Sequence, residues 1–206
     1  MTVLASAGAL GRPVREDALG LPKGVLARQE WELVQRAQRL EEPALAWLYE
    51  SYYPRIYSYA LLQLGDVQQA EDIASEVMLK VLEALPSYRF RGIPFSAWVF
   101  RIARNCLIDH HRRRKRRAEV GLDAAAAAPD KHNPQALAEV AFSRDELRRA
   151  LLYLTEEQRQ VIILKFIHGL DNKSVAKILG RSEGAIKSLQ HRALQALRRH
   201  LVRGER

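Results

Sequence analysis

The chain has 206 residues, and its 48% hydrophobic content allows it to bury either one core or two small ones. Its 33 Lys and Arg residues exceed its 24 Asp and Glu residues, and the net charge of +9 favours a polyanionic partner such as nucleic acid or an anionic membrane surface. Cys106 is the single cysteine, which excludes an intrachain disulfide and a cysteine-based metal cluster and indicates a reducing, cytoplasmic setting. No stretch predicts a membrane-spanning helix.

The N-terminal half of the chain is predicted to form one helical domain. Residues 1–28 lack a hydrophobic period and contain four glycines, so we expect a mobile extension there. From 29 to 117, apolar residues recur at three- and four-residue steps, which is typical of helices. Gly65 is expected to stop one helix and Asp66 to cap the next, and Pro54 either kinks the first helix or opens a second one.

Two more helices are predicted in this domain. The first runs to about Leu85 and has a largely acidic outer face, against which we expect either a basic protein partner or solvent. Pro86 ends it, and the connection over 87–94 mixes aromatic, basic and glycine residues. The second begins near Phe95 and ends in six consecutive basic residues, Arg112–Arg117.

The C-terminal part of the chain is predicted to form a second helical domain over 135–206. Residues 118–134 contain an alanine run and two prolines and are predicted to be a linker. Thr155 and Gln158 match a capping box, and helices over about 171–179 and from Ser182 to His200 match a helix-turn-helix. The last helix is expected to bury Ile186, Ala193, Leu194 and Leu197. The sequence therefore predicts an all-α fold of two small helical domains joined by a flexible linker.

Two patterns favour nucleic acid as the partner. In a helix-turn-helix the second helix enters the major groove, where Lys, Gln and Ser side chains donate to base edges and Arg contacts phosphate. Aromatic residues interleaved with arginines, as in 87–95, suit unpaired bases. The alternatives are an ordinary helical hairpin for the first pattern, and a core role for Phe95 and Trp98 with a solvated basic helix end for the second.

Catalytic chemistry is not predicted. The six histidines form no ligand spacing with carboxylates, and the sequence has neither a phosphate-binding glycine loop nor a nucleophile elbow. Cys106 is interpreted as a small buried hydrophobe. We therefore expect a binding protein that needs no cofactor or metal and is not an enzyme.

Three runs of residues resemble the extracytoplasmic-function sigma factors, group IV of the sigma-70 class of RNA polymerase sigma factors. They are AEDIASEV at 70–77, WVFRIARN at 98–105 followed by Asp109 and Arg112, and GAIKSLQHRA at 184–193. The resemblance covers about 42–117 and 143–201. It implies that the first domain, called region 2, binds the clamp of the largest polymerase subunit and melts the minus-ten promoter element. It also implies that the second, region 4, binds the flap of the second-largest subunit and reads the minus-thirty-five element.

The resemblance implies three sets of site residues. The minus-ten set is Tyr88, Arg89, Phe90, Arg91, Asn105, Asp109, Arg112, Arg113 and Arg114. The minus-thirty-five set is Arg181, Ser182, Glu183, Ala185, Lys187, Ser188, His191 and Arg192. The core polymerase set is Asp72, Ser75, Glu76, Leu79 and Lys80. The resemblance also allows an anti-sigma factor as a further partner.

The chain departs from the family pattern in the second domain. Ser174 stands where a glutamate is usual and Ala185 where a threonine is usual, so a promoter sequence cannot be transferred from a relative. Two rival functions stay open at this point. One is a helix-turn-helix regulator that acts without polymerase, and the other is an RNA-binding or antitermination protein.

Overall fold

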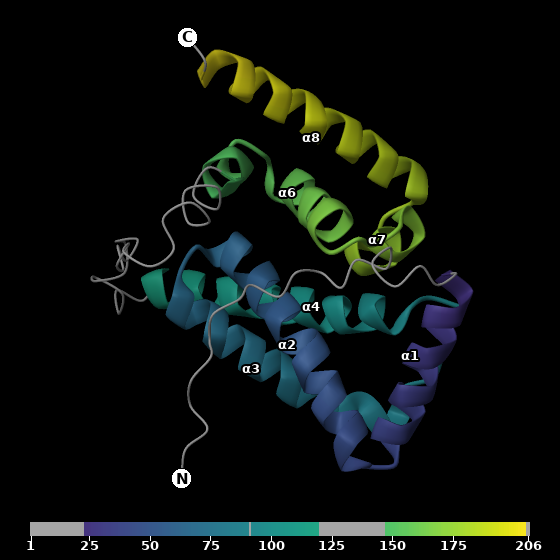
Figure 1. The fold of residues 1–206 in the computed structure, drawn as a ribbon. Coiled ribbons are helices and arrows are strands. Elements are labelled where there is room, and N and C mark those ends of the chain that lie inside the picture. The colour runs from purple at the N-terminus through teal and green to yellow at the C-terminus, as the bar shows by residue number, and fades with distance from the viewer. Residues whose placement is uncertain (1–22, 91, 120–146, 205–206) are drawn as a thin grey trace, which may run out of the picture.

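A computed structural model describes residues 23–90, 92–119 and 147–204 of the chain, and the regular elements over these ranges are all helical (Figure 1). The first unit consists of α1 (Lys23–Gln38), α2 (Glu42–Leu64), α3 (Val67–Ala84), the 3-10 turn η2 (Leu85–Ser87) and α4 (Phe95–Glu119). The second unit consists of the helical residues 147–152, α6 (Glu156–Ile162), the π-helical turn η3 (Ile163–Ile167), α7 (Asn172–Leu179) and α8 (Glu183–Gly204). Among these described helices, none combines the length and apolarity needed to cross a bilayer.

The first unit is a bundle of α2, α3 and α4, with α1 packed against α2 and η2. Helix α2 continues through Pro54, so the second helix that the sequence allowed there does not form. Its apolar stripe is buried on both sides of the proline, at Leu48, Tyr52 and Ile56, and this burial offsets the backbone hydrogen bond that proline cannot donate.

The turn between α2 and α3 confirms the predicted stop and cap. Gly65 adopts a left-handed conformation with φ of 73°, and its N–H donates to the carbonyl of Leu61 at 2.8 Å. The carboxylate of Asp66 accepts from the N–H of Gln69 at 2.8 Å and so satisfies one free donor of α3. The sharp turn lets α2 and α3 run side by side (Figure 1).

Two predicted domain boundaries differ from the helix ends in the structure. Helix α1 begins at Lys23, before residue 29, where the sequence placed the start of the first domain. The rest of the expected N-terminal extension, residues 1–22, lies outside the described residues. Most of the expected linker lies outside them as well, except that residues 118 and 119 form the end of α4.

Helices α6, α7 and α8 each begin at a side-chain cap. Thr155 and Gln158 form a reciprocal capping box at the start of α6, and the carboxylate of Asp171 accepts from the N–H of Ser174 at the start of α7. Gly180 ends α7 in a left-handed conformation, and the hydroxyl of Ser182 accepts from the N–H of Ala185 at 3.2 Å at the start of α8. Helices α7 and α8 are therefore joined by a three-residue turn, as a helix-turn-helix requires.

One predicted core position of α8 is wrong. Leu194 is 42% exposed, whereas Leu189, which the sequence reading did not count as core, is only 7% exposed. Together with Ile186 and Ala193, Leu189 follows the three- and four-residue steps of one face, and Leu194 lies one position beyond that face. The buried stripe of α8 is therefore narrower than the sequence suggested.

The two units pack against each other chiefly through α4 and α7, and a buried cluster around His168 lies between them. His168, which follows η3, lies against the rings of Tyr59 in α2 (centroids 6.0 Å apart) and Phe100 in α4 (4.6 Å). Arg55 donates to the carbonyl of His168 at 3.3 Å, and Arg104 donates to the side-chain carbonyl of Gln160 at 3.3 Å. Helix α4 thus lies between the rest of its own unit and the second unit (Figure 1).

Burial makes His168 difficult to protonate. Removal from solvent, reinforced by the charge of Arg55, lowers its pKa from 6.5 to about 3. The folded chain therefore keeps a neutral imidazole at a pH where the unfolded chain binds a proton, so the stability from this site is complete above pH 6.5 and falls as the pH drops.

We expect the free energy of unfolding to fall by about 1.4 kcal/mol for each pH unit below 6.5 because of His168 alone. Replacing the imidazole by a neutral amide, in His168→Gln, should remove this dependence of the free energy of unfolding on pH. Denaturant unfolding at several pH values between 7.5 and 5 measures the slope of that free energy against pH. Equal slopes for the variant and the wild type would contradict the assignment.

Two glycines, one in the turn between α7 and α8 and one at the start of α8, offer a matched pair of substitutions. Gly180→Ala places a side chain at φ of 65° and should lower the free energy of unfolding by about 1–2 kcal/mol. Gly184 lies inside α8 with only the hydroxyl oxygen of Ser182 within 4.0 Å of an added methyl group, so Gly184→Ala should be neutral or slightly stabilising. Thermal unfolding of both variants tests the pair, and a destabilised Gly184→Ala would contradict the described start of α8.

Candidate nucleic-acid interface

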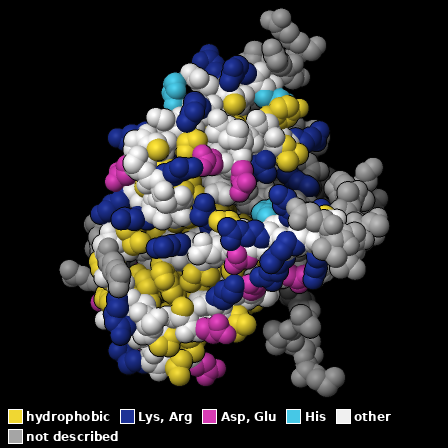
Figure 2. Space-filling model, turned by 180° about the vertical axis from the view of Figure 1, so that it is seen from behind, with side chains coloured by type: hydrophobic (Ala, Val, Ile, Leu, Met, Phe, Trp, Pro, Cys, Tyr) yellow, Lys and Arg dark blue, Asp and Glu magenta, His cyan; other side chains and the backbone are white. Residues whose placement is uncertain are grey.

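The C-terminal end of α4 carries a strongly basic surface. All six residues of Arg112–Arg117 are exposed, and several of them line an open groove together with Asp109. Lys and Arg side chains crowd one side of the molecule at mid-height, where this end of α4 lies (Figure 2). Asn105 and Asp109 are exposed on the same helix, so five residues of the predicted minus-ten set share one element: Asn105, Asp109, Arg112, Arg113 and Arg114.

The loop before α4 divides its predicted residues between surface and interior. Phe90 is 58% exposed, whereas Tyr88 is 5% exposed and packs against Trp98 with centroids 4.8 Å apart. Arg89 donates to the carbonyls of Pro86 and Tyr88, both at 2.9 Å, and so helps to shape the loop. Arg91, the remaining predicted residue of the loop, lies outside the described residues.

Helix α1 contributes side chains to this loop that the sequence analysis missed. Trp31 lies 6.1 Å from the ring of Tyr88 and 5.9 Å from that of Phe90. The side-chain amide of Gln38 donates to the carbonyls of Leu85 and Tyr88, both at 2.9 Å. A tryptophan at the start of the helical pattern was the only sequence signal, and it does not reveal a contact with a segment some fifty residues away.

The predicted core polymerase residues share the outward face of α3. Asp72, Ser75 and Leu79 are exposed, and Leu79 is an apolar side chain with 58% of its surface in solvent. Glu76 and Lys80 are half-buried and form an ion pair at 2.7 Å. The face therefore combines charged groups with an exposed leucine, a composition that suits contact with another protein.

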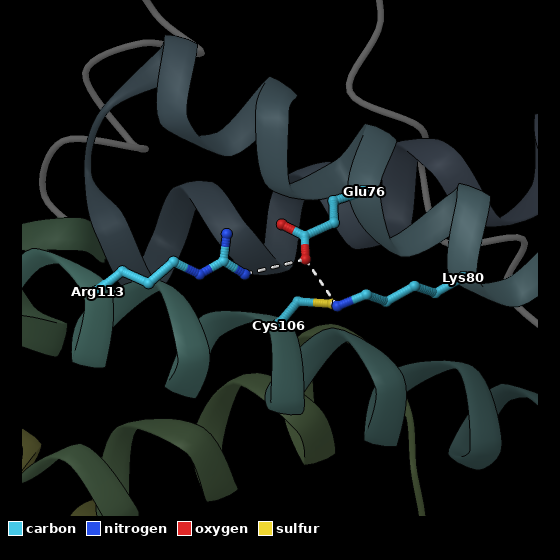
Figure 3. A network of polar contacts seen from close by, with 4 residues as sticks. All are labelled: Glu76, Lys80, Cys106 and Arg113. Atoms are coloured by element: carbon cyan, nitrogen blue, oxygen red, sulfur yellow. Dashed lines mark hydrogen bonds and ion pairs between the residues drawn. The ribbon is translucent and has the colours of Figure 1, made fainter.

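Glu76 also connects α3 to the basic end of α4. Its carboxylate accepts from Arg113 at 3.3 Å as well as from Lys80, and the Lys80 ammonium lies 3.4 Å from the sulfur of Cys106 (Figure 3). Partial burial raises the pKa of Glu76, but the hydrogen bond and charge of Lys80 and the charge of Arg113 outweigh it, so the net pKa is below the usual value. Glu76 therefore stays ionised near neutral pH and holds both cations.

The start of α8 presents the predicted minus-thirty-five set. Ala185 is half-exposed, and the exposed members are Arg181, Ser182, Glu183, Lys187, Ser188, His191 and Arg192. Arg181 pairs with Glu157 of α6, which fixes the turn before α8 to the rest of the unit. Fully buried Ile186 and Ala193 anchor the opposite face of α8, so the polar face is held outward on a rigid helix.

The described residues hold no group of three or more His, Cys, Asp or Glu side chains that could bind a metal ion. Cys106 is buried, and burial raises the pKa of its thiol, which keeps it in the protonated, unreactive form.

Models of two protein families match the chain in the order of its two units. Sigma-70 region 2 matches residues 48–117, and Sigma-70 region 4 matches residues 144–197. Helix α1 precedes the first match, whereas α8 extends a few residues beyond the second.

Curated relatives and solved structures agree with these matches. The chain is 34% identical to the ECF RNA polymerase sigma factor BldN of Streptomyces coelicolor over 82% of its own length and 65% of BldN, so it spans about two thirds of that relative. It is 34% identical to the ECF RNA polymerase sigma factor SigD of Mycobacterium tuberculosis over 77% of each chain.

Two solved structures have a similar fold. CnrH in complex with the cytosolic domain of CnrY gives a TM-score of 0.61 at 20% identity, over 82% of this chain and 94% of that one. The sigma factor RpoE of Bartonella quintana, in complex with the anti-sigma factor NepR, gives a TM-score of 0.55 at 27% identity, over 72% of this chain and 91% of that one. With both family matches and these relatives, the chain belongs to the extracytoplasmic-function (ECF) family of RNA polymerase sigma factors.

Proposed function

We propose that this chain binds core RNA polymerase and directs it to promoters, with the first unit acting at the minus-ten element and the second at the minus-thirty-five element. The observation that carries the proposal is that the two family matches fall on two helical units, each with its own exposed basic surface. The chain acts by binding rather than by catalysis, in the cytoplasm with the polymerase. The complex of RpoE with NepR supports an anti-sigma factor as a further partner.

The first unit suits a DNA strand that is being separated. The exposed Arg112–Arg117 run supplies positive charge for the backbone, and Phe90 supplies an exposed ring on which a base can stack. Disrupting a base step costs a few kcal/mol, which stacking and phosphate contacts of this kind must offset. Asn105 and Asp109 lie between the two features in sequence and supply polar groups for base edges.

The second unit suits duplex DNA. A helix with one fully buried face and one polar face can enter a major groove without rearranging. Lys187 and Ser188 offer donors for base-edge acceptors, whereas Arg181 and Arg192 offer charge for phosphates. Because α7 supports α8 directly, the depth of insertion is set by the packing of the unit.

The outward face of α3 suits the polymerase contact. Exposed Leu79 among Asp72, Ser75 and Glu76 gives an apolar centre with a charged surround, as protein interfaces commonly have. The ion pair of Glu76 with Arg113 joins this face to the minus-ten set, so we expect a partner that engages Glu76 to release Arg113 towards DNA.

The two units must separate on a promoter. Elements centred about 25 base pairs apart lie roughly 85 Å apart along B-form DNA, whereas a compact chain of this length is only about 40 Å across. Residues 120–146 are long enough to span about 90 Å when extended. We therefore expect the contact around His168 to open when both elements are engaged.

Transcription with purified core polymerase on a library of promoter fragments tests the proposal. Specific initiation should occur only when this protein is added, because core polymerase alone does not select promoters. Binding to duplex DNA without any effect on core polymerase would instead indicate the polymerase-independent regulator, and salt-sensitive binding to RNA alone would indicate the antitermination protein. Either outcome would reject the sigma function.

Two single substitutions should separate the roles of the units. Lys187→Ala should reduce use of the upstream duplex element by about 5- to 100-fold, the range expected for one lost base contact. It should leave binding to a template with a pre-melted minus-ten element intact. Arg113→Ala should weaken opening and lower its salt dependence, because one phosphate contact is lost.

Each of these variants is the control for the other. Binding to core polymerase, measured by fluorescence anisotropy of a labelled chain, should persist in both. Loss of core binding in Lys187→Ala would show that α8 is assigned to the wrong partner.

A further inference from the structure

A small pocket lies between α1 and the loop that precedes α4. Its volume is about 130 Å³, and its walls include Glu30 and Trp31 of α1 and Tyr88, Phe90 and Phe95 from the other side. The lining is mainly aromatic and apolar, with glycine and proline completing the loop side. Such walls favour a flat ring over a charged or flexible group.

The aromatic walls are arranged around the pocket rather than stacked on one another. The ring of Trp31 meets Tyr88 at 60° and Phe90 at 48°, with centroids about 6 Å apart in both cases. Neither face of Trp31 is therefore covered by a parallel ring of these two neighbours. A planar ligand could stack on the indole, which is the type of contact that holds unpaired bases.

Two polar groups restrict the choice of ligand. The hydroxyl of Tyr88 is buried and has no hydrogen-bond partner among the described residues, so a ligand that accepts a hydrogen bond would satisfy it. Burial, with a smaller effect of Glu30, raises the pKa of Tyr88 to about 12, so the hydroxyl keeps its proton. The carboxylate of Glu30 on the opposite wall repels phosphate, which favours a base over the backbone.

The position of α1 relative to the loop is fixed. Gln38 donates to the carbonyls of Leu85 and Tyr88, and Glu30 accepts from the hydroxyl of Tyr52, a fully buried residue of α2. The α1 wall of the pocket is thus tied to both neighbouring segments, and it is preorganised without help from DNA.

We propose that Trp31 is a base-binding residue that stacks on an unpaired base of the minus-ten strand held in this pocket. The inference rests on the proposed function and extends it to α1, which precedes the residues matched by the region 2 family. Trp31 supplies the stacking face, Tyr88 donates to an acceptor on the base edge, and Glu30 keeps the sugar-phosphate backbone outside.

The test uses the complete chain in complex with core polymerase and a promoter obtained from the library experiment. Forked DNA with an unpaired minus-ten strand is prepared intact and with one abasic nucleotide at each position in turn. In the wild type, the abasic change at the captured position should lower affinity by about 5- to 100-fold, the range for one stacked base. In Trp31→Ala, affinity for intact DNA should fall, and most of the loss of affinity caused by that abasic nucleotide (the abasic penalty) should disappear.

Two further variants separate stacking from folding. Trp31→Leu keeps apolar bulk without an aromatic face and should behave as Trp31→Ala, whereas Trp31→Phe should keep most of the penalty. Trp47→Ala is the matched control, because Trp47 is also half-buried but packs on Tyr52 at 6.2 Å and does not line the pocket. It should retain the full penalty.

The outcomes are distinguishable. A full abasic penalty in a folded Trp31→Leu variant would overturn the role of Trp31 and leave the proposed function intact. A wild type that initiates transcription but shows no abasic penalty at any position would overturn base capture by this pocket. Absence of polymerase-dependent initiation would reject the proposed function itself.

Discussion

The structure depends on the burial of helix α4 on two sides. Phe100 is fully buried, with Tyr59 of the first unit and His168 of the second against its ring, and Ala103 beside it leaves room for close packing. Because this stretch of the helix is enclosed, its direction is fixed, and the exposed Arg112–Arg117 end is held in one place. A basic segment on a free helix would lose that orientation, and ordering it on DNA would cost conformational entropy.

The same helix contacts a residue of a second predicted site, which the sequence treats as separate. Glu76 on the outward face of α3 pairs with Arg113 of the predicted minus-ten set and with Lys80 at the same time. The pair is partly exposed, so its contribution to stability is small, on the order of 0–1 kcal/mol. The pair matters for the position of its side chains, because a ligand that binds Glu76 changes the environment of Arg113, and a ligand that binds Arg113 changes that of Glu76.

Aromatic residues of the first unit serve two purposes at once. Tyr88 and Phe95 belong to the buried core and also line the pocket beside α1, and Trp31 joins them from a helix outside the matched family region. Rings that are fixed by core packing have few alternative rotamers, so a pocket built from them changes little when a ligand binds. Core stability and the shape of the pocket are therefore coupled in this loop.

The sequence by itself determined the local structure: the Gly65 stop, the Asp66 cap, the Thr155 capping box and the α7–α8 turn follow from residues within four positions of one another, and the family motifs are local as well. It also determined which residues carry charge at the start of α8. Only the tertiary structure decided the partners of Trp31, Glu76 and His168, because each contacts a segment distant in sequence, and helical periodicity identifies a buried face without identifying what covers it. For the same reason periodicity placed Leu194 in the core, whereas the packing of α8 against α6 and α7 selected Leu189.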